Sequence, residues 1–177
     1  TGVDSIDLES CRRRGIAVLR AEGANARGVA ELALGLMLAL LRSIPFGDAR
    51  MKAGGWERRQ GAELEEKTLG VIGTGKIGKL VARFGLALGM NVVGADTYPD
   101  TALAKTPGFR YATIPELLAC SDIVTLHCPH EPGAKPLVDT AALASMKKGA
   151  YLVNTARAGL VDADAVLKSL ADGRLAG

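Results

Sequence analysis

Apolar and polar residues follow two different patterns along this chain, and the change falls near residue 67. From there on, short β-rich runs alternate with segments that carry apolar residues at helical spacing. Strands are predicted at 68–72, 91–95, 123–126 and 151–153. Helices are predicted at 76–88, 116–120, 140–146 and 162–171, with Thr113 as the cap of the second and Asp162 as the cap of the fourth. Strands that alternate with helices of this length form a parallel sheet covered on both faces. We therefore predict an α/β fold with a Rossmann-type doubly wound parallel sheet.

The opening part of the chain is less regular. A short helix is predicted to run to Arg14, with Asp4 or Ser5 as its cap and Gly15 at its end. The β-rich run 16–19 follows this helix and is predicted as a strand. We therefore expect one short helix and one strand before residue 20.

A long apolar helix comes next. It is predicted over 28–44, beginning at Arg27 or Gly28, and Pro45 interrupts or ends it. Its apolar residues cover every face, which indicates that the helix packs on both sides. A subunit interface would satisfy that need, so we expect a homodimer or a higher homo-oligomer through this helix. The polar stretch 54–60 shows neither helical nor strand periodicity and is predicted as a loop.

Composition and charge exclude several functional classes. Apolar residues make up 48% of the 177 and aromatic residues 4%, with 22 glycines, which is typical of an α/β domain. The net charge is +3, and the basic residues are scattered apart from Arg12–Arg14, which we interpret as a solvated helix face. The longest apolar run, Leu32–Leu41, is too short to span a bilayer. We therefore expect no nucleic-acid partner and no membrane partner.

The cysteines show no metal-ligand spacing. Cys11, Cys120 and Cys128 cannot all pair, and the chain has only two histidines, so we expect no structural zinc site and no other metal. Reduced thiols in an intracellular compartment are the simplest explanation, and no signal peptide is visible. The sequence therefore predicts a cytoplasmic protein.

A glycine-rich turn follows the strand predicted at 68–72. Residues 73–78 have the G-x-G-x-x-G pattern, and they lead directly into a predicted helix. In this motif Gly73 permits a tight turn, Gly75 lets a pyrophosphate approach the backbone, and Gly78 allows the helix to pack closely on the strand. The free N–H groups at the helix start then bind phosphate. The alternative, a turn that binds nothing, is weaker because both flanking elements are present.

Asp96 lies at the C-terminal end of the next predicted strand. A carboxylate at this place accepts hydrogen bonds from the adenosine ribose hydroxyls and repels a phosphate on that ribose. No arginine immediately follows Asp96 to bind such a phosphate, so the sequence predicts NAD rather than NADP. The alternative is an aspartate that only initiates the turn before Tyr98 and Pro99.

Residues 154–162, with the sequence NTARAGLVD, closely resemble the arginine signature of the D-isomer-specific 2-hydroxyacid dehydrogenases. Further matches to this family occur in the family's order, at 1–4, 29–32, 55–56, 67–70, 73–78 and 126–129. Several ordered matches are far more specific than any one of them. Within the family, the spacing between 42–45 and 51–58 is most similar to the D-3-phosphoglycerate dehydrogenase branch.

The resemblance implies a two-lobed subunit that holds the reaction in the cleft between a substrate lobe and an NAD lobe. Residues 1–23 would be the tail of the substrate lobe, and 24–177 would be the linking helix and most of the NAD lobe. The chain begins without Met and stops where a further strand is expected, so both ends look like cuts in a longer subunit. The expected substrate is a 2-keto or 2-hydroxy acid.

The resemblance also assigns roles to individual residues. The family's catalytic arginine falls on Arg157, which would bind the carboxylate and carbonyl of the keto acid and stabilise charge on the carbonyl oxygen during hydride transfer. The cofactor-binding positions fall on Thr1, Gly73, Gly75, Lys76, Ile77, Gly78, Asp96, Cys128, Thr155, Ala156 and Arg157. Two residues depart from the family's usual pattern: Ala158 replaces a glycine, and Cys128 replaces a threonine or another small residue.

The two histidines are not expected to act in catalysis. His127 matches a family position near the cofactor that is not the proton donor, and His130 lies in a predicted loop. The resemblance implies that the catalytic histidine and its glutamate lie beyond Gly177. Residues 1–177 alone are therefore expected to be inactive.

Two other functions stay open at this point. The C-terminal-binding transcriptional corepressors resemble the same family and use NAD to control dimerisation, and Arg157 does not exclude that function. A dehydrogenase of another substrate class, such as one that oxidises phosphite or formate, has the same fold. We favour the 2-hydroxy acid dehydrogenase, because the peptide-binding groove that a corepressor needs belongs to the other lobe.

Overall fold

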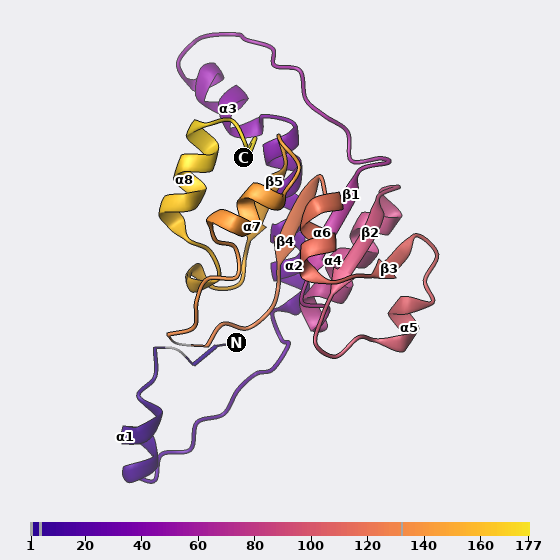
Figure 1. The fold of residues 1–177 in the computed structure, drawn as a ribbon. Coiled ribbons are helices and arrows are strands. Elements are labelled where there is room, and N and C mark those ends of the chain that lie inside the picture. The colour runs from indigo at the N-terminus through magenta and orange to yellow at the C-terminus, as the bar shows by residue number, and fades with distance from the viewer. Residues whose placement is uncertain (1, 4, 132) are drawn as a thin grey trace.

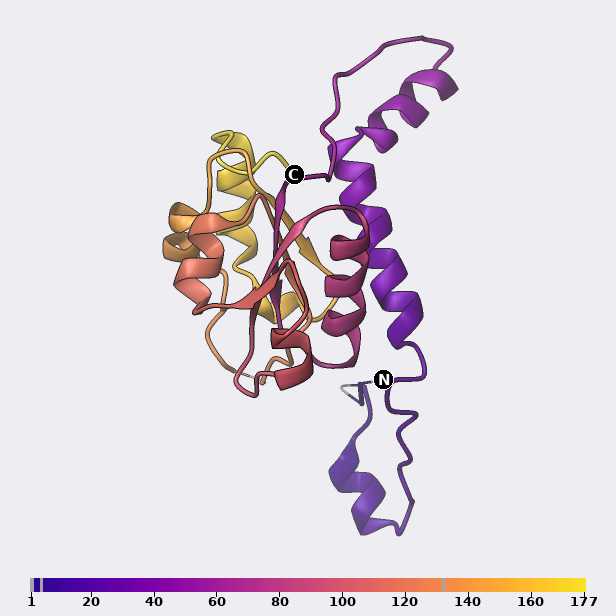
Figure 2. The same ribbon diagram turned by 90° about the vertical axis from the view of Figure 1, so that its right-hand side faces the viewer.

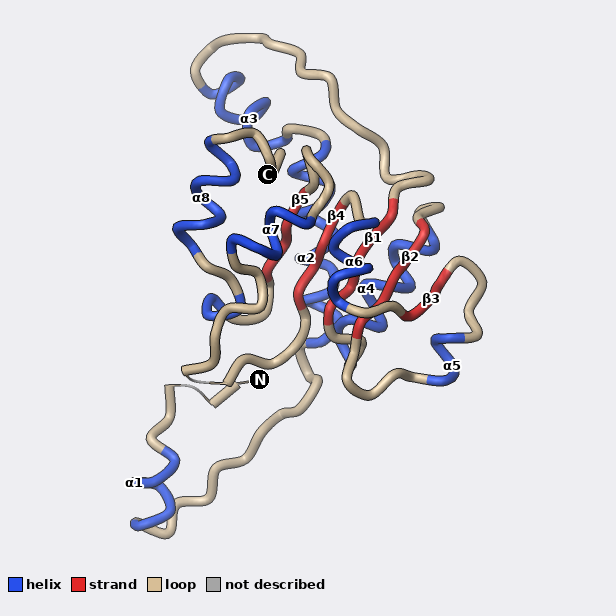
Figure 3. The backbone as a smooth tube through the Cα atoms, viewed as in Figure 1, coloured by secondary structure: helices blue, strands red, loops and turns tan. Residues whose placement is uncertain are grey.

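A computed structural model describes residues 2–3, 5–131 and 133–177 and confirms the predicted α/β fold. Its five parallel strands are arranged in the order β3-β2-β1-β4-β5 (Figures 1 and 3). The strands are β1 (Thr68–Ile72), β2 (Asn91–Ala95), β3 (Phe109–Tyr111), β4 (Ile123–Leu126) and β5 (Tyr151–Asn154). Because the strands are parallel, their carboxyl ends share one edge of the sheet. The chain returns across β1 to reach β4, and ligands bind in such folds at the carboxyl edge where the strand order reverses in this way.

Helices cover both faces of the sheet (Figure 2). Among the described residues the helices of the chain are α1 (Leu8–Arg13), α2 (Ala26–Leu41), α3 (Ile44–Lys52), α4 (Lys76–Ala87), α5 (Thr101–Ala104), α6 (Ile114–Cys120), α7 (Thr140–Ser145), the 3₁₀ turn η1 (Ala158–Leu160) and α8 (Ala163–Ala171). Helices α2 and α4 pack together on one face, and α6, α7 and α8 contribute to the core on the other face. The sheet is therefore doubly wound, as predicted.

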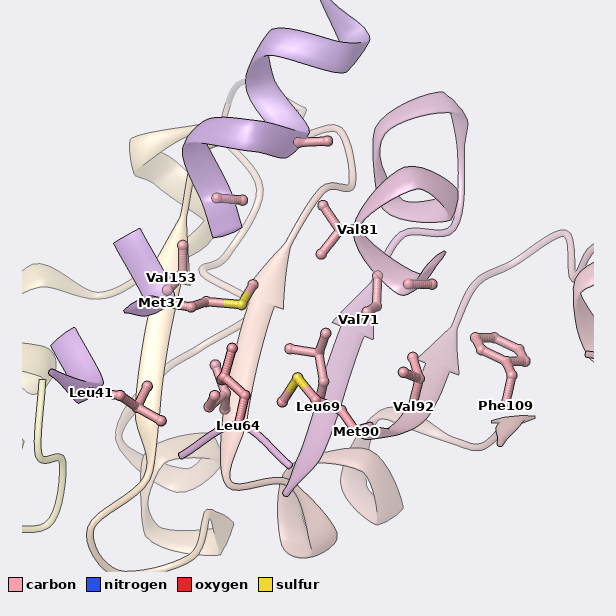
Figure 4. Close-up of a cluster of buried hydrophobic side chains, with 14 of the residues drawn as sticks. Met37, Leu41, Leu64, Leu69, Val71, Val81, Met90, Val92, Phe109 and Val153 are labelled. Atoms are coloured by element: carbon pink, nitrogen blue, oxygen red, sulfur yellow. The ribbon is translucent and has the colours of Figure 1, made fainter. Parts of the chain in front are cut away.

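Two hydrophobic clusters hold these layers together. In β1, Leu69 and Val71 join the cluster beneath α2 and α4, which Figure 4 shows, while Ile72 joins the cluster on the opposite face. Successive side chains of a strand point to opposite faces, so a strand covered on both sides is buried at nearly every position. Met37 and Leu41 bring α2 into the first cluster and are almost completely buried.

The long apolar helix differs from the prediction in two ways. Helix α2 ends at Leu41, Ser43 adopts a left-handed conformation with φ of 52°, and Pro45 lies in the first turn of a second helix, α3. Proline fits the first turn of a helix because its missing N–H has no partner there in any case. Against the described part of the chain, α2 also packs on one side only: Leu32 and Leu36 on its other side are 55% and 39% exposed.

The segment before α2 extends away from the sheet (Figures 1 and 2) and contains no buried residue among those described. Helix α1 is capped by Asp7, which accepts from the N–H of Ser10 at 2.9 Å; the predicted caps were Ser5 and Asp4, and Asp4 lies outside the described residues. The predicted strand at 16–19 was wrong, because these residues form no ladder. A β-rich run becomes a strand only when a neighbouring backbone pairs with it.

The prediction missed α5 and β3, both of which are short. β3 lies at the sheet edge and pairs with β2 through Val92 and Phe109.

The predicted helix starts at Thr113 and Asp162 were confirmed: Thr113 forms a capping box with Glu116, and Asp162 caps α8. Among the described residues no single helix is long and apolar enough to cross a membrane; α2 and α3 reach that length and composition only when taken together, across a 68° bend.

Candidate functional site

Strand β1 ends in the glycine-rich turn, which packs tightly against its surroundings. Gly73 has φ of 90°, and a Cβ on it would lie 2.6 Å from the backbone nitrogen of Cys128. A Cβ on Gly78 would lie 1.9 Å from the carbonyl oxygen of Gly73. Both positions require glycine, because the turn contacts the segment after β4 on one side and the first turn of α4 on the other.

The start of α4 is open toward a ligand. Gly75 is its N-cap, no side chain among the described residues caps the helix, and a Cβ on Gly75 would meet no atom within 4 Å. The N–H groups of Lys76, Ile77 and Gly78 therefore begin a twelve-residue helix without a side-chain acceptor. These groups and the positive end of the helix dipole attract an anion, which suits a phosphate beside Gly75.

Asp96 follows β2 and lies beside this turn. Its Oδ2 accepts hydrogen bonds from the Thr74 N–H at 2.6 Å and from the Thr74 hydroxyl at 3.0 Å, and its Oδ1 accepts from the Tyr98 N–H at 2.9 Å. Burial acts to raise the pKa of Asp96, but these hydrogen bonds outweigh it and hold the pKa below its ordinary value. The carboxylate is therefore ionised at neutral pH.

A first cleft of about 650 Å³ lies over the carboxyl ends of β1 and β2. Asp96 and the glycine turn line it on one side, while Ile114 at the start of α6 and Leu137 give it apolar walls. Cys128 lines it as well, and burial raises the pKa of its thiol, which stays protonated at neutral pH. An apolar slot with an ionised carboxylate beside it suits an adenosine.

A second cleft of about 690 Å³ adjoins the first. It is lined by Lys76 and Ile77 of α4, by Asn25 at the start of α2, and by 155–157 after β5. Residues 127–129 line both clefts, so the two meet at the end of β4. One molecule that extends from Asp96 past the start of α4 would pass from the first cleft into the second.

Arg157 lies in the loop that leaves β5 and lines the second cleft. The Asn154 side chain shapes this loop: its Oδ1 accepts from the Ala156 N–H at 3.0 Å, and its Nδ2 donates to the Arg157 carbonyl oxygen at 2.8 Å. The exposed guanidinium donates to the Ala156 carbonyl oxygen at 3.0 Å. The backbone on both sides of Arg157 is thus held in place, while its side chain extends to the cleft.

His127 lies where the two clefts meet. Its Nε2 is 2.9 Å from the Thr125 hydroxyl oxygen, while its buried Nδ1 has no hydrogen-bond partner among the described residues. Burial lowers the pKa of His127 to about 4, so the ring is neutral at physiological pH. The buried hydroxyl of Thr155, after the neighbouring strand β5, also lacks a partner there. Because buried polar atoms normally have partners, these two atoms mark places where a bound molecule would complete the hydrogen bonding.

The site residues predicted from the sequence divide between the clefts. The first cleft is lined by Gly73, Gly75, Asp96 and Cys128. The second is lined by Lys76, Ile77, Cys128, Thr155, Ala156 and Arg157. Gly78 is buried beneath the turn and lines neither cleft, and Thr1 lies outside the described residues. The sequence reasoning missed Thr74 and Tyr111: the motif treats position 74 as variable, and only the hydrogen bonds reveal these two residues.

The residues present fit a dinucleotide. An ionised carboxylate lies at one end, an uncapped helix start and the unpartnered His127 Nδ1 in the middle, and the unpartnered Thr155 hydroxyl with Arg157 at the other end. Among the described residues, no group of three or more His, Cys, Asp or Glu residues could hold a metal ion.

Comparison with known proteins agrees with this geometry. Residues 34–177 match the family described as D-isomer specific 2-hydroxyacid dehydrogenase, NAD binding domain. The D-3-phosphoglycerate dehydrogenase of Methanocaldococcus jannaschii is 42% identical over 98% of this chain and 34% of its own length. The apo-structure of Escherichia coli D-lactate dehydrogenase matches with a TM-score of 0.91 and 34% identity, over 98% of this chain and 55% of that one. Staphylococcus aureus formate dehydrogenase in complex with NAD matches with a TM-score of 0.86 and 33% identity, over 100% and 54%.

The chain spans about a third of the curated relative and about half of the two solved structures. The matches give the corepressor alternative no support. NAD is the cofactor of this domain. With the family match over most of its length, the chain belongs to the NAD-binding domains of the D-isomer specific 2-hydroxyacid dehydrogenases.

Proposed function

We propose that the gene product carrying this chain is an oxidoreductase that transfers hydride between NAD(H) and a 2-hydroxy or 2-keto acid. The observation that carries this proposal is the presence of Arg157 in the second cleft, which adjoins the cleft of Asp96 at the end of β4. A dinucleotide whose adenosine lies beside Asp96 has its nicotinamide end in the cleft of Arg157. A substrate bound there meets both the hydride carrier and a fixed cation.

The residues of this chain bind the cofactor, orient the substrate and stabilise the negative charge on the substrate's carbonyl oxygen. The N–H groups of Lys76 and Ile77 bind the pyrophosphate, and Asp96 receives the ribose hydroxyls. The Arg157 guanidinium binds the substrate carboxylate through two parallel hydrogen bonds and stabilises negative charge on the neighbouring carbonyl oxygen. NAD, when bound, supplies or accepts the hydride. We assign the exchange of the substrate proton to neither histidine of this chain.

The substrate lobe is also part of this proposal. Residues 1–23 belong to it, and 24–177 form the linking helix and the NAD lobe. The exposed course of the described residues before α2 supports this division, because that segment shares no core with the sheet. We propose 3-phosphoglycerate as the first substrate to test, because the 42% identical relative is a D-3-phosphoglycerate dehydrogenase. The three free thiols accord with the reducing cytoplasm, which we propose as the compartment.

The test follows NADH absorbance with the whole gene product and a panel of 2-keto acids that includes phosphohydroxypyruvate, with formate and NAD⁺ as the comparison. Arg157→Ala is expected to lower turnover by about 10²- to 10³-fold, as the removal of one charge-stabilising donor does in other enzymes. Arg157→Lys is the matched control: it retains the charge but lacks the planar two-pronged donor, so it should restore little of the activity.

Each outcome of this test is decisive. Turnover of a 2-keto acid that requires Arg157 supports the proposal and identifies the substrate. Turnover of formate alone would contradict the 2-hydroxy acid assignment. Tight NADH binding without turnover of any panel member would contradict the dehydrogenase assignment and favour a protein that only senses NAD.

We further propose that the exposed side of α2 forms a homodimer interface. Leu32 and Leu36 lie about one helical turn apart on this side, so the helix presents two neighbouring exposed leucines to solvent. A second copy of the same helix would cover them through a two-fold contact.

Leu36→Glu tests this interface, because a charge buried between two subunits is costly. Sedimentation velocity should then show monomers. Leu167→Glu is the matched control, since Leu167 is 64% exposed on α8, on the other side of the sheet, and its variant should keep the wild-type assembly. Intact dimers of the Leu36 variant would contradict the assignment.

A further inference from the structure

A line of hydrogen bonds runs from Asp96 back into the domain. The Thr74 hydroxyl lies 3.0 Å from Asp96 Oδ2 and 2.9 Å from the Tyr111 hydroxyl. The Tyr111 hydroxyl accepts from the N–H of Asp100 at 2.9 Å. These four residues come from the glycine turn, the end of β2, β3 and the cap of α5. Segments that are distant in sequence therefore converge on one carboxylate.

The two ends of this line fix the direction of every hydrogen bond in it. The ionised carboxylate of Asp96 can only accept, so the single proton of the Thr74 hydroxyl is directed at Asp96. The Thr74 oxygen therefore accepts the Tyr111 proton, and the Tyr111 oxygen accepts from the backbone N–H of Asp100, which can only donate. Each hydroxyl donates to the next group toward Asp96, and hydrogen bonds aligned in this way strengthen one another.

Packing holds the two hydroxyls in place. Thr74 is 2% exposed, and a Cβ on Gly94 of β2 would lie 3.1 Å from its methyl group and 2.5 Å from the ring of Phe109. Tyr111 meets the same Phe109 ring edge-on, with 4.9 Å between the ring centroids. Neither hydroxyl can swing away without displacing buried neighbours.

The far end of the line is anchored as well. Asp100 forms an ion pair with Lys79 of α4 and caps α5 through the N–H groups of Ala102 and Leu103. The hydrogen bond from Lys79 and these N–H groups lower the pKa of Asp100 to about 2, so it is ionised at neutral pH. The loop between Asp96 and Asp100, which lines the first cleft, is thus tied to α4.

We propose that Thr74 and Tyr111 are positioning residues that set the cofactor preference, by holding the Asp96 carboxylate where it receives the ribose hydroxyls of NAD and repels the ribose phosphate of NADP. This proposal rests on the proposed role of Asp96 in the first cleft. A carboxylate with one acceptor bond could rotate away from the added phosphate. Asp96 accepts three bonds, so rotation would break hydrogen bonds to an ion, which are stronger than those between neutral groups.

The experiment measures the dissociation constants of NADH and NADPH by cofactor fluorescence on the whole gene product. Thr74→Val and Tyr111→Phe remove one hydroxyl each at nearly constant volume, and Thr74→Ser, which keeps the hydroxyl, is the matched control. We expect the first two variants to narrow the NADH-over-NADPH affinity ratio by about three- to tenfold, the scale of one hydrogen bond. Thr74→Ser should keep the wild-type ratio. In turnover the KM for NADH should rise while kcat stays constant.

The outcomes separate this proposal from the function beneath it. If the wild type prefers NADH and both hydroxyl-deleting variants keep its ratio, the positioning role is overturned while the NAD assignment stands. If the variants lose affinity for NADH and NADPH equally, so that the affinity ratio stays unchanged, the hydroxyls have only a structural role. That result also overturns the positioning role. If the wild type binds NADH and NADPH equally well, or if Asp96→Asn keeps the wild-type affinity ratio, Asp96 does not select the cofactor. In that case both the proposed role of Asp96 and this proposal are contradicted. Should Tyr111→Phe fail to fold, the comparison of Thr74→Val with Thr74→Ser decides the question alone.

Discussion

The two clefts differ in how far their polar groups are already satisfied. In the first cleft, both oxygens of the Asp96 carboxylate accept hydrogen bonds, and the Thr74 hydroxyl that donates to one of them is itself held by Tyr111. The Thr155 hydroxyl in the second cleft is buried without a partner among the described residues, and so is His127 Nδ1 where the two clefts meet. The carboxylate of the first cleft is thus already held by hydrogen bonds, whereas the second cleft and the junction have hydrogen-bonding capacity to fill.

This difference agrees with the function proposed for each cleft: cofactor binding in the first and catalysis in the second. A binding site gains affinity when its groups are ordered before the ligand arrives, because less conformational entropy is lost on binding. A site for chemistry gains rate from groups that are completed only when the substrate and the other lobe are present. Arg157, extended from a loop whose backbone Asn154 holds, suits the second case.

The largest effect is expected from Gly75→Ser, at the start of α4 between the clefts, which should weaken NADH binding without lowering the stability of the fold. Serine is a favourable N-cap and no atom lies within 4 Å of the added Cβ, so stability should hold or rise by a few tenths of a kcal/mol. Its hydroxyl would occupy the helix N–H groups and the space of the phosphate. We expect NADH binding, measured calorimetrically, to weaken on the order of 100-fold, or about 2.8 kcal/mol.

Gly78→Ala is the control for this prediction, because its Cβ would lie 1.9 Å from the Gly73 carbonyl oxygen. It should lower the free energy of unfolding by about 1–3 kcal/mol through overpacking. An unchanged NADH affinity in Gly75→Ser would contradict the phosphate site at the start of α4.

His127 should make the domain sensitive to acid. Its pKa is about 4 in the folded state and ordinarily 6.5, so the unfolded chain binds this proton first as the pH falls. Stability from this residue is therefore complete above pH 6.5 and is lost as the pH falls toward 4. Urea unfolding at pH 7 and pH 5 should differ by about 2 kcal/mol through His127. His127→Gln, which retains a polar group toward Thr125, should remove that part of the difference; an identical pH dependence in the variant would sink the idea.

Thr113→Ala should have the smallest effect. Thr113 and Glu116 exchange capping hydrogen bonds at the start of α6, which forms one wall of the first cleft. Loss of the cap should cost about 1 kcal/mol of stability in thermal unfolding, and Thr113→Ser should restore it. If α6 only closes the first cleft, turnover at saturating NADH stays constant; a fall in kcat would show that the clefts are coupled.

Much of the fold and part of the site could be predicted because their signals are local. The alternation after residue 67 predicts the parallel sheet, and Thr113, placed just before a helical run, predicts the cap of α6, which the structure confirms. The strand predicted at 16–19 was wrong because its β-rich composition says nothing about a partner. Helix α3 was missed because Pro45 was treated only as a helix breaker, although it also fits a first turn.

The NAD-binding architecture could be predicted from the sequence alone: glycines at 73, 75 and 78 between a strand and a helix, and an aspartate at the end of the next strand. These features are readable because each depends on local structure within a few residues, whereas the role of Arg157 came from the resemblance to a family. The contacts that support these residues became visible only in the folded domain. Tyr111 reaches Thr74 across 37 positions because β3 pairs beside β2, and His127 is neutral because the packed ends of β4 and β5 exclude water. Contacts of this kind depend on which segments meet in space, and that is fixed by packing of the whole domain.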